Sequence, residues 1–196
     1  MTVLAIDTST AAGGVALVTE EGLLGEYLLN RREAHSERLI PACKRLMEDA
    51  GVGLRELGGV AVAVGPGSFT GLRIGVTFAK GLAFCLGIPL AGVVTLDALA
   101  SGVGRPFSGL ICPLIQARRD EVYTALYEAR SEGTVRLEEF RIVSVGDLLM
   151  ELGRGAKHIL FVGDGALRYK SVIGERLGDR ALFLRPSQCF PRASVV

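Results

Sequence analysis

The glycine-rich segment VGPGSFTGLR, residues 64–73, has the composition of a loop that could bind an anion. It follows a β-branched run and precedes a predicted helix, and the first amides of a helix are unpaired donors that favour negative charge. The spacing G-x-G-x-x-x-G differs from a dinucleotide fingerprint, and no Gly-Lys-Ser/Thr follows as in a P-loop. Ser68 lacks the flanking glycines of a nucleophile elbow. A tight structural turn is therefore favoured over an anion site.

Two aspartates follow predicted strands, where a carboxylate could assist nucleotide binding. Asp7 ends the run Val3 to Ile6 and opens the sequence DTST, and a carboxylate there could hold hydrated Mg²⁺. Asp164 lies between two glycines at a strand-to-helix junction and could make a second contact. The candidate nucleotide-binding residues are Asp7, Thr8, Ser9, Gly163, Asp164 and Gly165. The alternative is that both aspartates are ordinary turn residues.

The cysteines and histidines do not follow the spacing of a metal site. His35 and His158 lie far apart in the sequence, and the cysteines contain no C-x-x-C pair, which excludes a zinc ribbon and a thioredoxin motif. Buried, reduced thiols are expected at the four scattered positions Cys43, Cys85, Cys112 and Cys189. The residues alone therefore predict no metal ligands and no catalytic group.

Charge and hydropathy argue against a direct nucleic-acid or membrane partner. The 196-residue chain has 22 Lys and Arg against 21 Asp and Glu, without the basic excess of a nucleic-acid-binding protein. Its start, MTVLAIDTST, has no basic region ahead of an apolar run, unlike a signal peptide. The apolar stretch Val76 to Val94 contains Lys80 and is interrupted by Gly87 and Pro89, so it is a poor membrane span. We expect a soluble, cytoplasmic protein.

Hydrophobic periodicity predicts three strands followed by alternating helices and strands in the first half of the chain. This order forms a mixed sheet covered by helices, as in one half of an actin-like or hexokinase-like protein. The predicted elements are strands Val3–Ile6, Val15–Val18 and Leu23–Leu29, helix His35–Ala50, strand Gly59–Val64, helix Leu72–Leu86 and strand Pro89–Val93.

The looser segment Ser101 to Ser108, with Gly102, Gly104 and Pro106, predicts a boundary between two lobes, 1–100 and 101–196. The second lobe is expected to be a smaller, reduced copy of the first with fewer elements. Its predicted elements are strands Leu110–Gln116, Glu121–Tyr127 and Val135–Ile142, helix Val145–Leu152, strand Ile159–Val162 and helix Leu167–Leu177. The predicted fold is α/β with two lobes of mixed sheet and flanking helices.

The predicted helix Leu72–Leu86 and the residue before it carry small residues at every fourth position, with large apolar residues around most of the remaining circumference. Such a helix is buried on more than one side. Its small face could pack inside the chain against the helix His35–Ala50, or a partner protein could contact both helices. The candidate interface residues are Leu39, Cys43, Gly71, Gly75, Ala79 and Ala83.

Several segments together resemble the TsaB (YeaZ) family, whose fold is that of the actin-like ATPases (ASKHA, ribonuclease H-like). The similar segments are AIDTST, AHSERLIP at 34–41, VGPGSFTGLRIG at 64–75, AKGLAFCLGIPLAGV at 79–93, TLDALA at 95–100 and ARRDEVYTALYE at 117–128. The resemblance covers most of the chain. Family chains continue beyond the position of Pro191, so we expect the second lobe to be truncated. At Gln116 the family pattern has Asp.

The resemblance implies a noncatalytic paralogue of TsaD (Gcp/YgjD), the enzyme that transfers threonylcarbamoyl to the adenosine beside the anticodon of tRNA. In TsaD two histidines on a VNHMEGH-like helix hold the metal. The matching positions here are Leu96 and Ala100, which cannot bind one. The chain is therefore expected to act as a scaffold subunit without a catalytic residue or a metal.

The resemblance also implies the partners. These are TsaD in a heterodimer, TsaE through the TsaB–TsaD complex, a second copy in a homodimer, and tRNA only through the complex. No cofactor is expected, except ATP or ADP with Mg²⁺ at an interface of the complex. The alternative function is a free-standing ATPase or kinase of the actin-like superfamily that uses Asp7 and Asp164. Metallopeptidase activity is disfavoured because the two histidines are missing.

Overall fold

The computed structural model describes residues 1–30, 35–104 and 107–196, which form two compact units. The first unit contains Met1–Ala98 and Pro191–Val196, and the second contains Leu99–Phe190. The predicted 101–196 lobe therefore needs a correction, because the last six residues pack with the first unit. Pro106, in the predicted boundary segment, lies outside the described residues.

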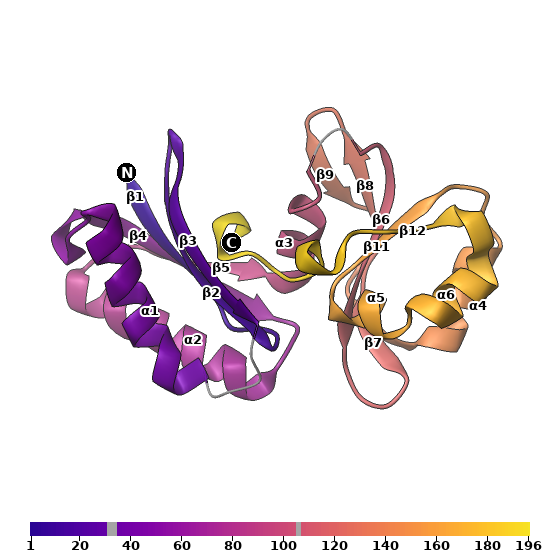
Figure 1. The fold of residues 1–196 in the computed structure, drawn as a ribbon, viewed down its shortest axis with the longest axis horizontal. Coiled ribbons are helices and arrows are strands. Elements are labelled where there is room, and N and C mark those ends of the chain that lie inside the picture. The colour runs from indigo at the N-terminus through magenta and orange to yellow at the C-terminus, as the bar shows by residue number, and fades with distance from the viewer. Residues whose placement is uncertain (31–34, 105–106) are drawn as a thin grey trace. The chain divides into compact units, whose positions relative to one another are not determined.

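The first unit contains a five-stranded mixed sheet in the order β3-β2-β1-β4-β5, as the described residues show it. The pairs β1–β2 and β2–β3 are antiparallel, whereas β1–β4 and β4–β5 are parallel. Figure 1 shows the two long helices side by side on one face of this sheet. The predicted order is confirmed, with β1 (Thr2–Asp7), β2 (Ala12–Thr19), β3 (Gly22–Asn30), α1 (His35–Ala50), η1 (Leu54–Glu56), β4 (Leu57–Gly65), α2 (Phe69–Leu86), β5 (Leu90–Val94), α3 (Thr95–Ser101) and η4 (Ala193–Val195).

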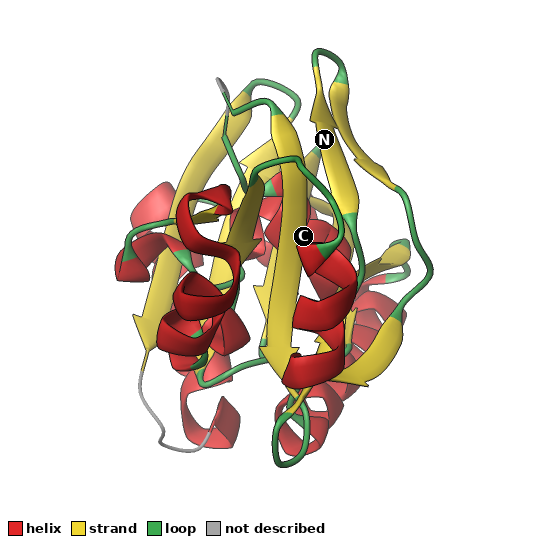
Figure 2. Cartoon of the chain, turned by 90° about the vertical axis from the view of Figure 1, so that its right-hand side faces the viewer, coloured by secondary structure: helices red, strands yellow, loops and turns green. Residues whose placement is uncertain are grey.

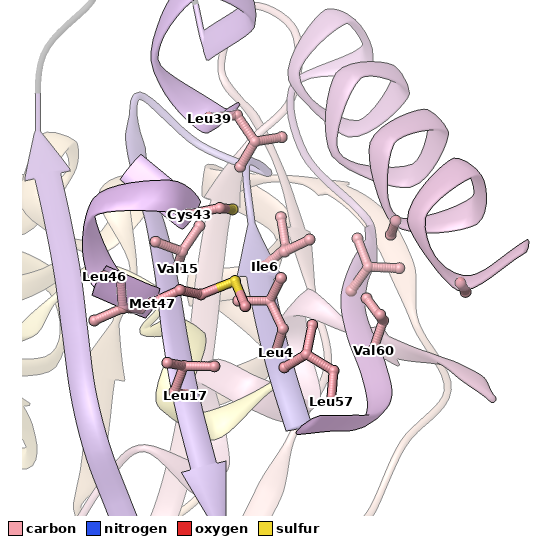
Figure 3. Close-up of a cluster of buried hydrophobic side chains, with 13 residues drawn as sticks. Leu4, Ile6, Val15, Leu17, Leu39, Cys43, Leu46, Met47, Leu57 and Val60 are labelled. Atoms are coloured by element: carbon pink, nitrogen blue, oxygen red, sulfur yellow. The ribbon is translucent and has the colours of Figure 1, made fainter. Parts of the chain in front are cut away.

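The core of the first unit joins both long helices to one face of the sheet. Alternate residues of β1 and β2 point to this face, and they meet the apolar side of α1 (Figure 3). The helix α2 starts three residues earlier than predicted because the Ser68 hydroxyl accepts a hydrogen bond from the Gly71 amide and so caps the helix. It ends at Gly87, which has a left-handed conformation.

The second unit contains seven strands among its described residues, so the expectation of fewer elements is wrong for its strands. Its helices pack against one face of β6 and β11 and enclose a separate core. In Figure 2 this unit faces the viewer. The elements are β6 (Gly109–Gln116), β7 (Glu121–Thr124), β8 (Tyr127–Arg130), β9 (Gly133–Arg136), β10 (Arg141–Ser144), α4 (Val145–Gly153), β11 (Ile159–Val162), α5 (Asp164–Arg168), α6 (Lys170–Leu177), η2 (Gly178–Arg180), β12 (Ala181–Phe183) and η3 (Pro186–Gln188).

Three predicted elements of this unit are each divided in two. The strand predicted at 121–127 is interrupted between β7 and β8, although both pair with β6 in one register. The interruption lies opposite Pro113, which has no amide hydrogen to donate to the neighbouring strand. The strand predicted at 135–142 corresponds to β9 and β10, and the predicted helix 167–177 is divided into α5 and α6 at Tyr169.

Candidate functional site

The DTST turn that follows β1 is closed by the chain itself. Its four residues are each 4% exposed or less, and the Ser9 amide and hydroxyl both donate to Asp7 Oδ1, at 2.9 and 2.7 Å. The Ser68 amide donates to the Ser9 carbonyl at 2.7 Å. A Cβ on Gly67 would lie 2.2 Å from that carbonyl oxygen, so only glycine fits. The loop 65–68 therefore packs directly on the turn, which supports the structural interpretation of the glycine-rich segment.

The start of α2 closes the same turn from another side. The Thr8 hydroxyl donates to the Gly71 carbonyl at 2.7 Å, and a Cβ on Gly75 would lie 2.3 Å from the Thr8 oxygen. These two glycines bring the helix backbone onto the end of β1. The polar groups of Thr8 and Ser9, both predicted to contact nucleotide, make hydrogen bonds within the first unit.

The small-residue face of α2 points into the chain, which favours internal packing, one of the two alternatives that the sequence left open, for the candidate interface residues on this helix. Ala79 and Ala83 belong to the hydrophobic core over the sheet, and Gly71 and Gly75 are also buried. The packing partner is mainly the sheet, whereas the sequence suggested the helix 35–50. Leu39 and Cys43 on α1 are buried too, although each also lines a hollow between the helices.

The second candidate turn, Gly163-Asp164-Gly165, is held by Gln116. The backbone amide of Gln116 donates to Asp164 Oδ1 at 3.1 Å, and its side-chain amide donates to Oδ2 at 3.3 Å. Burial raises the pKa of the Asp164 carboxyl, while the Gln116 hydrogen bonds act in the opposite direction. Both glycines lie against the Leu114 carbonyl. Gln116 thus has a structural partner, and Asp164 lies in the second unit whereas Asp7 lies in the first.

No cluster of three or more potential metal-binding side chains occurs within the part of the chain that the structure describes. Leu96 and Ala100, which occupy the positions of the two TsaD histidines, are fully buried on α3. Burial raises the pKa of the Cys43 thiol to about 12, so this cysteine is a neutral core residue.

An apolar groove lies between α1 and α2 on the surface of the first unit. One hollow of about 570 Å³ and another of about 490 Å³ both contact Ile40 and Phe78, so they adjoin along the groove. The first hollow also contacts Met47, Leu54 and Leu82. Ile40 is 59% exposed, and a water-exposed apolar groove of this kind is typical of a protein-binding surface.

The outer side of α2 continues this apolar surface. Phe69 and Phe84, near the two ends of the helix, are 74% and 89% exposed. Arg73 stacks over the Phe69 ring at 5.5 Å and also lines the smaller hollow. Judged by length and composition alone, α2 is the one helix in the described ranges that could cross a membrane, with a mean hydropathy of 1.3. We call the groove together with Phe69 and Phe84 the α1–α2 face.

A second pattern on this helix indicates the α1–α2 face, but the prediction for this helix rested on its small residues. Positions 78, 82 and 85 lie on one side of α2 by the i, i+4, i+7 rule, next to but distinct from the face of Ala79 and Ala83. One side of this helix is already buried by small residues. Apolar residues on a second side therefore indicate an external partner.

Comparison with known proteins identifies the family. Residues 23–171 match the family described as "TsaD: tRNA N6-adenosine threonylcarbamoyltransferase". The chain is 39% identical over 194 residues to the Bacillus subtilis protein named tRNA threonylcarbamoyladenosine biosynthesis protein TsaB, covering 99% of this chain and 84% of that protein. The chain belongs to the TsaB (YeaZ) family.

Solved structures agree with this assignment. The structure of YeaZ from Pseudomonas aeruginosa superimposes with a TM-score of 0.81 at 30% identity, covering 99% of this chain and 87% of that one. A ROK hexokinase from Thermus thermophilus gives a TM-score of 0.51 at 13% identity, covering 100% and 97%, a similarity of fold alone. The predicted α/β, actin-like fold is confirmed, and so is the resemblance to TsaB.

Proposed function

We propose that this chain is a noncatalytic subunit for threonylcarbamoyladenosine modification of tRNA, and that it binds TsaD through the α1–α2 face. The observation that carries the proposal is the exposed apolar groove on a member of the TsaB family. A partner helix with an apolar side could enter the groove between Ile40 and Phe78, as amphipathic helices do in other helix-binding grooves.

The noncatalytic part of the proposal rests on side chains that cannot bind a metal or that already make hydrogen bonds within the chain. Leu96 and Ala100 cannot bind a metal, and they stand where TsaD has histidines. The hydroxyls of Thr8 and Ser9 donate hydrogen bonds to acceptors within the first unit. Gln116 donates two hydrogen bonds to the Asp164 carboxylate. These observations favour a scaffold over the alternative, a free-standing ATPase or kinase that uses Asp7 and Asp164.

The further partners follow from the same proposal. A second copy would use the α1–α2 face in a homodimer and would therefore compete with TsaD. TsaE and tRNA would join through the TsaB–TsaD complex, and ATP or ADP with Mg²⁺ would bind at an interface of that complex. The place of action would be the cytoplasm, where tRNA is modified.

Gly81→Trp is the sharpest test of the face. Gly81 is exposed on the side of α2 next to the groove, and a Cβ there meets no atom within 4 Å, so the isolated chain should fold normally. The indole would occupy space that a partner needs. Overpacking costs about 1–3 kcal/mol, or roughly a five- to hundredfold loss of affinity for TsaD. Calorimetry would give the affinity, and reconstituted tRNA modification would give the activity.

The matched control is Gly174→Trp, on α6 of the second unit, where an added Cβ likewise meets no atom within 4 Å. It should bind TsaD as the wild type does. A folded Gly81→Trp variant with wild-type affinity for TsaD would place the interface elsewhere. Modification activity that does not require this chain at all would remove the proposed role.

A further inference from the structure

We infer that Glu26 is a positioning residue that fastens the returning segment, Pro191–Val196, to the first unit. The chain leaves this unit after Ala98 and returns to it at Pro191. Glu26 lies on β3, more than 160 residues before the segment that it holds. This inference is independent of the proposed function, because the groove lies on the opposite face of the sheet.

The contacts of Glu26 form a clasp of charge-assisted hydrogen bonds. The Ser194 amide and the Ser194 hydroxyl both donate to Glu26 Oε1, each at 2.9 Å. Arg192 Nε donates to Oε2 at 2.9 Å, and the Arg192 Nη2 group contacts the same oxygen. One carboxylate thus binds a backbone amide, a hydroxyl and a guanidinium from two nearby residues, which is the strong class of hydrogen bond.

Burial distinguishes this clasp from an ordinary surface ion pair. The Glu26 side chain is only 7% exposed, whereas that of Arg192 is 53% exposed, so water screens the Ser194 hydrogen bonds less than the ion pair with Arg192. Burial by itself raises the pKa of the Glu26 carboxyl, but the hydrogen bonds from Arg192 and Ser194 hold that pKa below its usual value. The charged form of Glu26 is therefore the one that the returning segment stabilises.

The clasp seats Ala193 on the face of the sheet opposite to α1 and α2. Ala193 is fully buried against Ala5, Ala16 and Ala61, whose strand neighbours point into the core under the helices. Only small side chains leave room for a segment that approaches so closely. Figure 1 shows the C-terminal turn on that side of the sheet, beyond β2 and away from the two helices.

The returning segment is short between Cys189 and Ala193, which are both buried. Cys189 belongs to the second unit, where its thiol contacts the Arg185 carbonyl at 3.5 Å, and Ala193 is buried in the first. Residues 190–192 are the stretch between them.

The test uses trypsin, which cleaves after Arg192 only when the segment leaves the sheet. Glu26→Gln keeps the shape of the side chain but removes its charge. The variant should speed cleavage at this bond about tenfold or more, because the loss of one hydrogen bond to a charged group changes an equilibrium constant by about one order of magnitude. Glu21→Gln, on the exposed turn after β2, is the matched control and should cleave at the wild-type rate. Cleavage at the exposed Arg55 serves as the internal reference.

Hydrogen exchange of the Ser194 amide provides a second readout, because this amide donates to Glu26 and should lose its protection in Glu26→Gln. Unchanged cleavage after Arg192 and unchanged exchange in the folded variant would overturn the inference. Faster cleavage at Arg55 as well would also overturn it, because Glu26 would then support the whole unit rather than anchor one segment. TsaD binding should remain at the wild-type level, which separates this test from that of the proposed function.

Discussion

Replacing two glycines of α2 by alanine should change stability in opposite directions. At Gly75 a Cβ would lie 2.3 Å from the Thr8 hydroxyl oxygen, whereas at Gly81 it would meet no atom within 4 Å. Alanine in a helix interior is favoured over glycine by about 1 kcal/mol, and this gain applies at both positions. At Gly81 nothing opposes it, so Gly81→Ala should stabilise the chain by roughly 0.5–1 kcal/mol.

At Gly75 two costs oppose the gain. Pushing Thr8 away from the helix costs about 1–3 kcal/mol as overpacking, and loss of its 2.7 Å hydrogen bond to Gly71 costs about 0.5–1.5 kcal/mol more. After subtraction of the helix term, Gly75→Ala should destabilise the chain by roughly 0.5–3.5 kcal/mol. Urea unfolding followed by circular dichroism would measure both variants. Equal stabilisation by the two alanines would refute the close packing of α2 on the DTST turn.

Three further predictions concern reactivity. Cys85 is the exposed thiol of the four, so a maleimide should label it quickly and leave Cys43 unmodified, and bound TsaD should slow that labelling. The isolated chain should hydrolyse ATP at a rate far below about 1 per second, which is the lower end of ordinary enzyme rates. Asp7→Ala should not change that rate. Faster turnover that Asp7→Ala abolishes would favour the ATPase alternative. Elemental analysis should find no stoichiometric transition metal, because Leu96 and Ala100 occupy the ligand positions, and about one zinc or iron per chain would contradict this.

The elements of the first unit were predictable because local patterns determine them. Short continuous apolar runs mark β1 and β2, and the 3.6-residue period marks α1 over its full observed range. The patterns also showed that α2 has a face of small residues. They did not show what packs on that face, because a small-residue stripe suits a sheet as well as another helix. Only the three-dimensional positions of β1 and β4 decide between these.

The candidate site was predicted in parts rather than as a whole. Gln116 and Asp164 were each noted, but their pairing depends on β6 and β11 being adjacent parallel strands that end at the same edge. The clasp of Glu26 on Arg192 joins residues 166 positions apart, and neither has a local pattern that indicates the other. Contacts of this kind depend on the course of the chain between them, which periodicity does not describe.

The closed DTST turn and the open groove have a common structural cause in the position of α2. Gly71 and Gly75 let the helix backbone approach the end of β1, where the loop 65–68 and the helix pack directly on the DTST turn. The same close approach directs Ala79 and Ala83 to the sheet and leaves Phe78 facing the groove beside α1. Opening the turn to a nucleotide would require α2 to withdraw, and that movement would disturb the walls of the groove. The packing of the DTST turn and the shape of the groove are therefore linked through one helix.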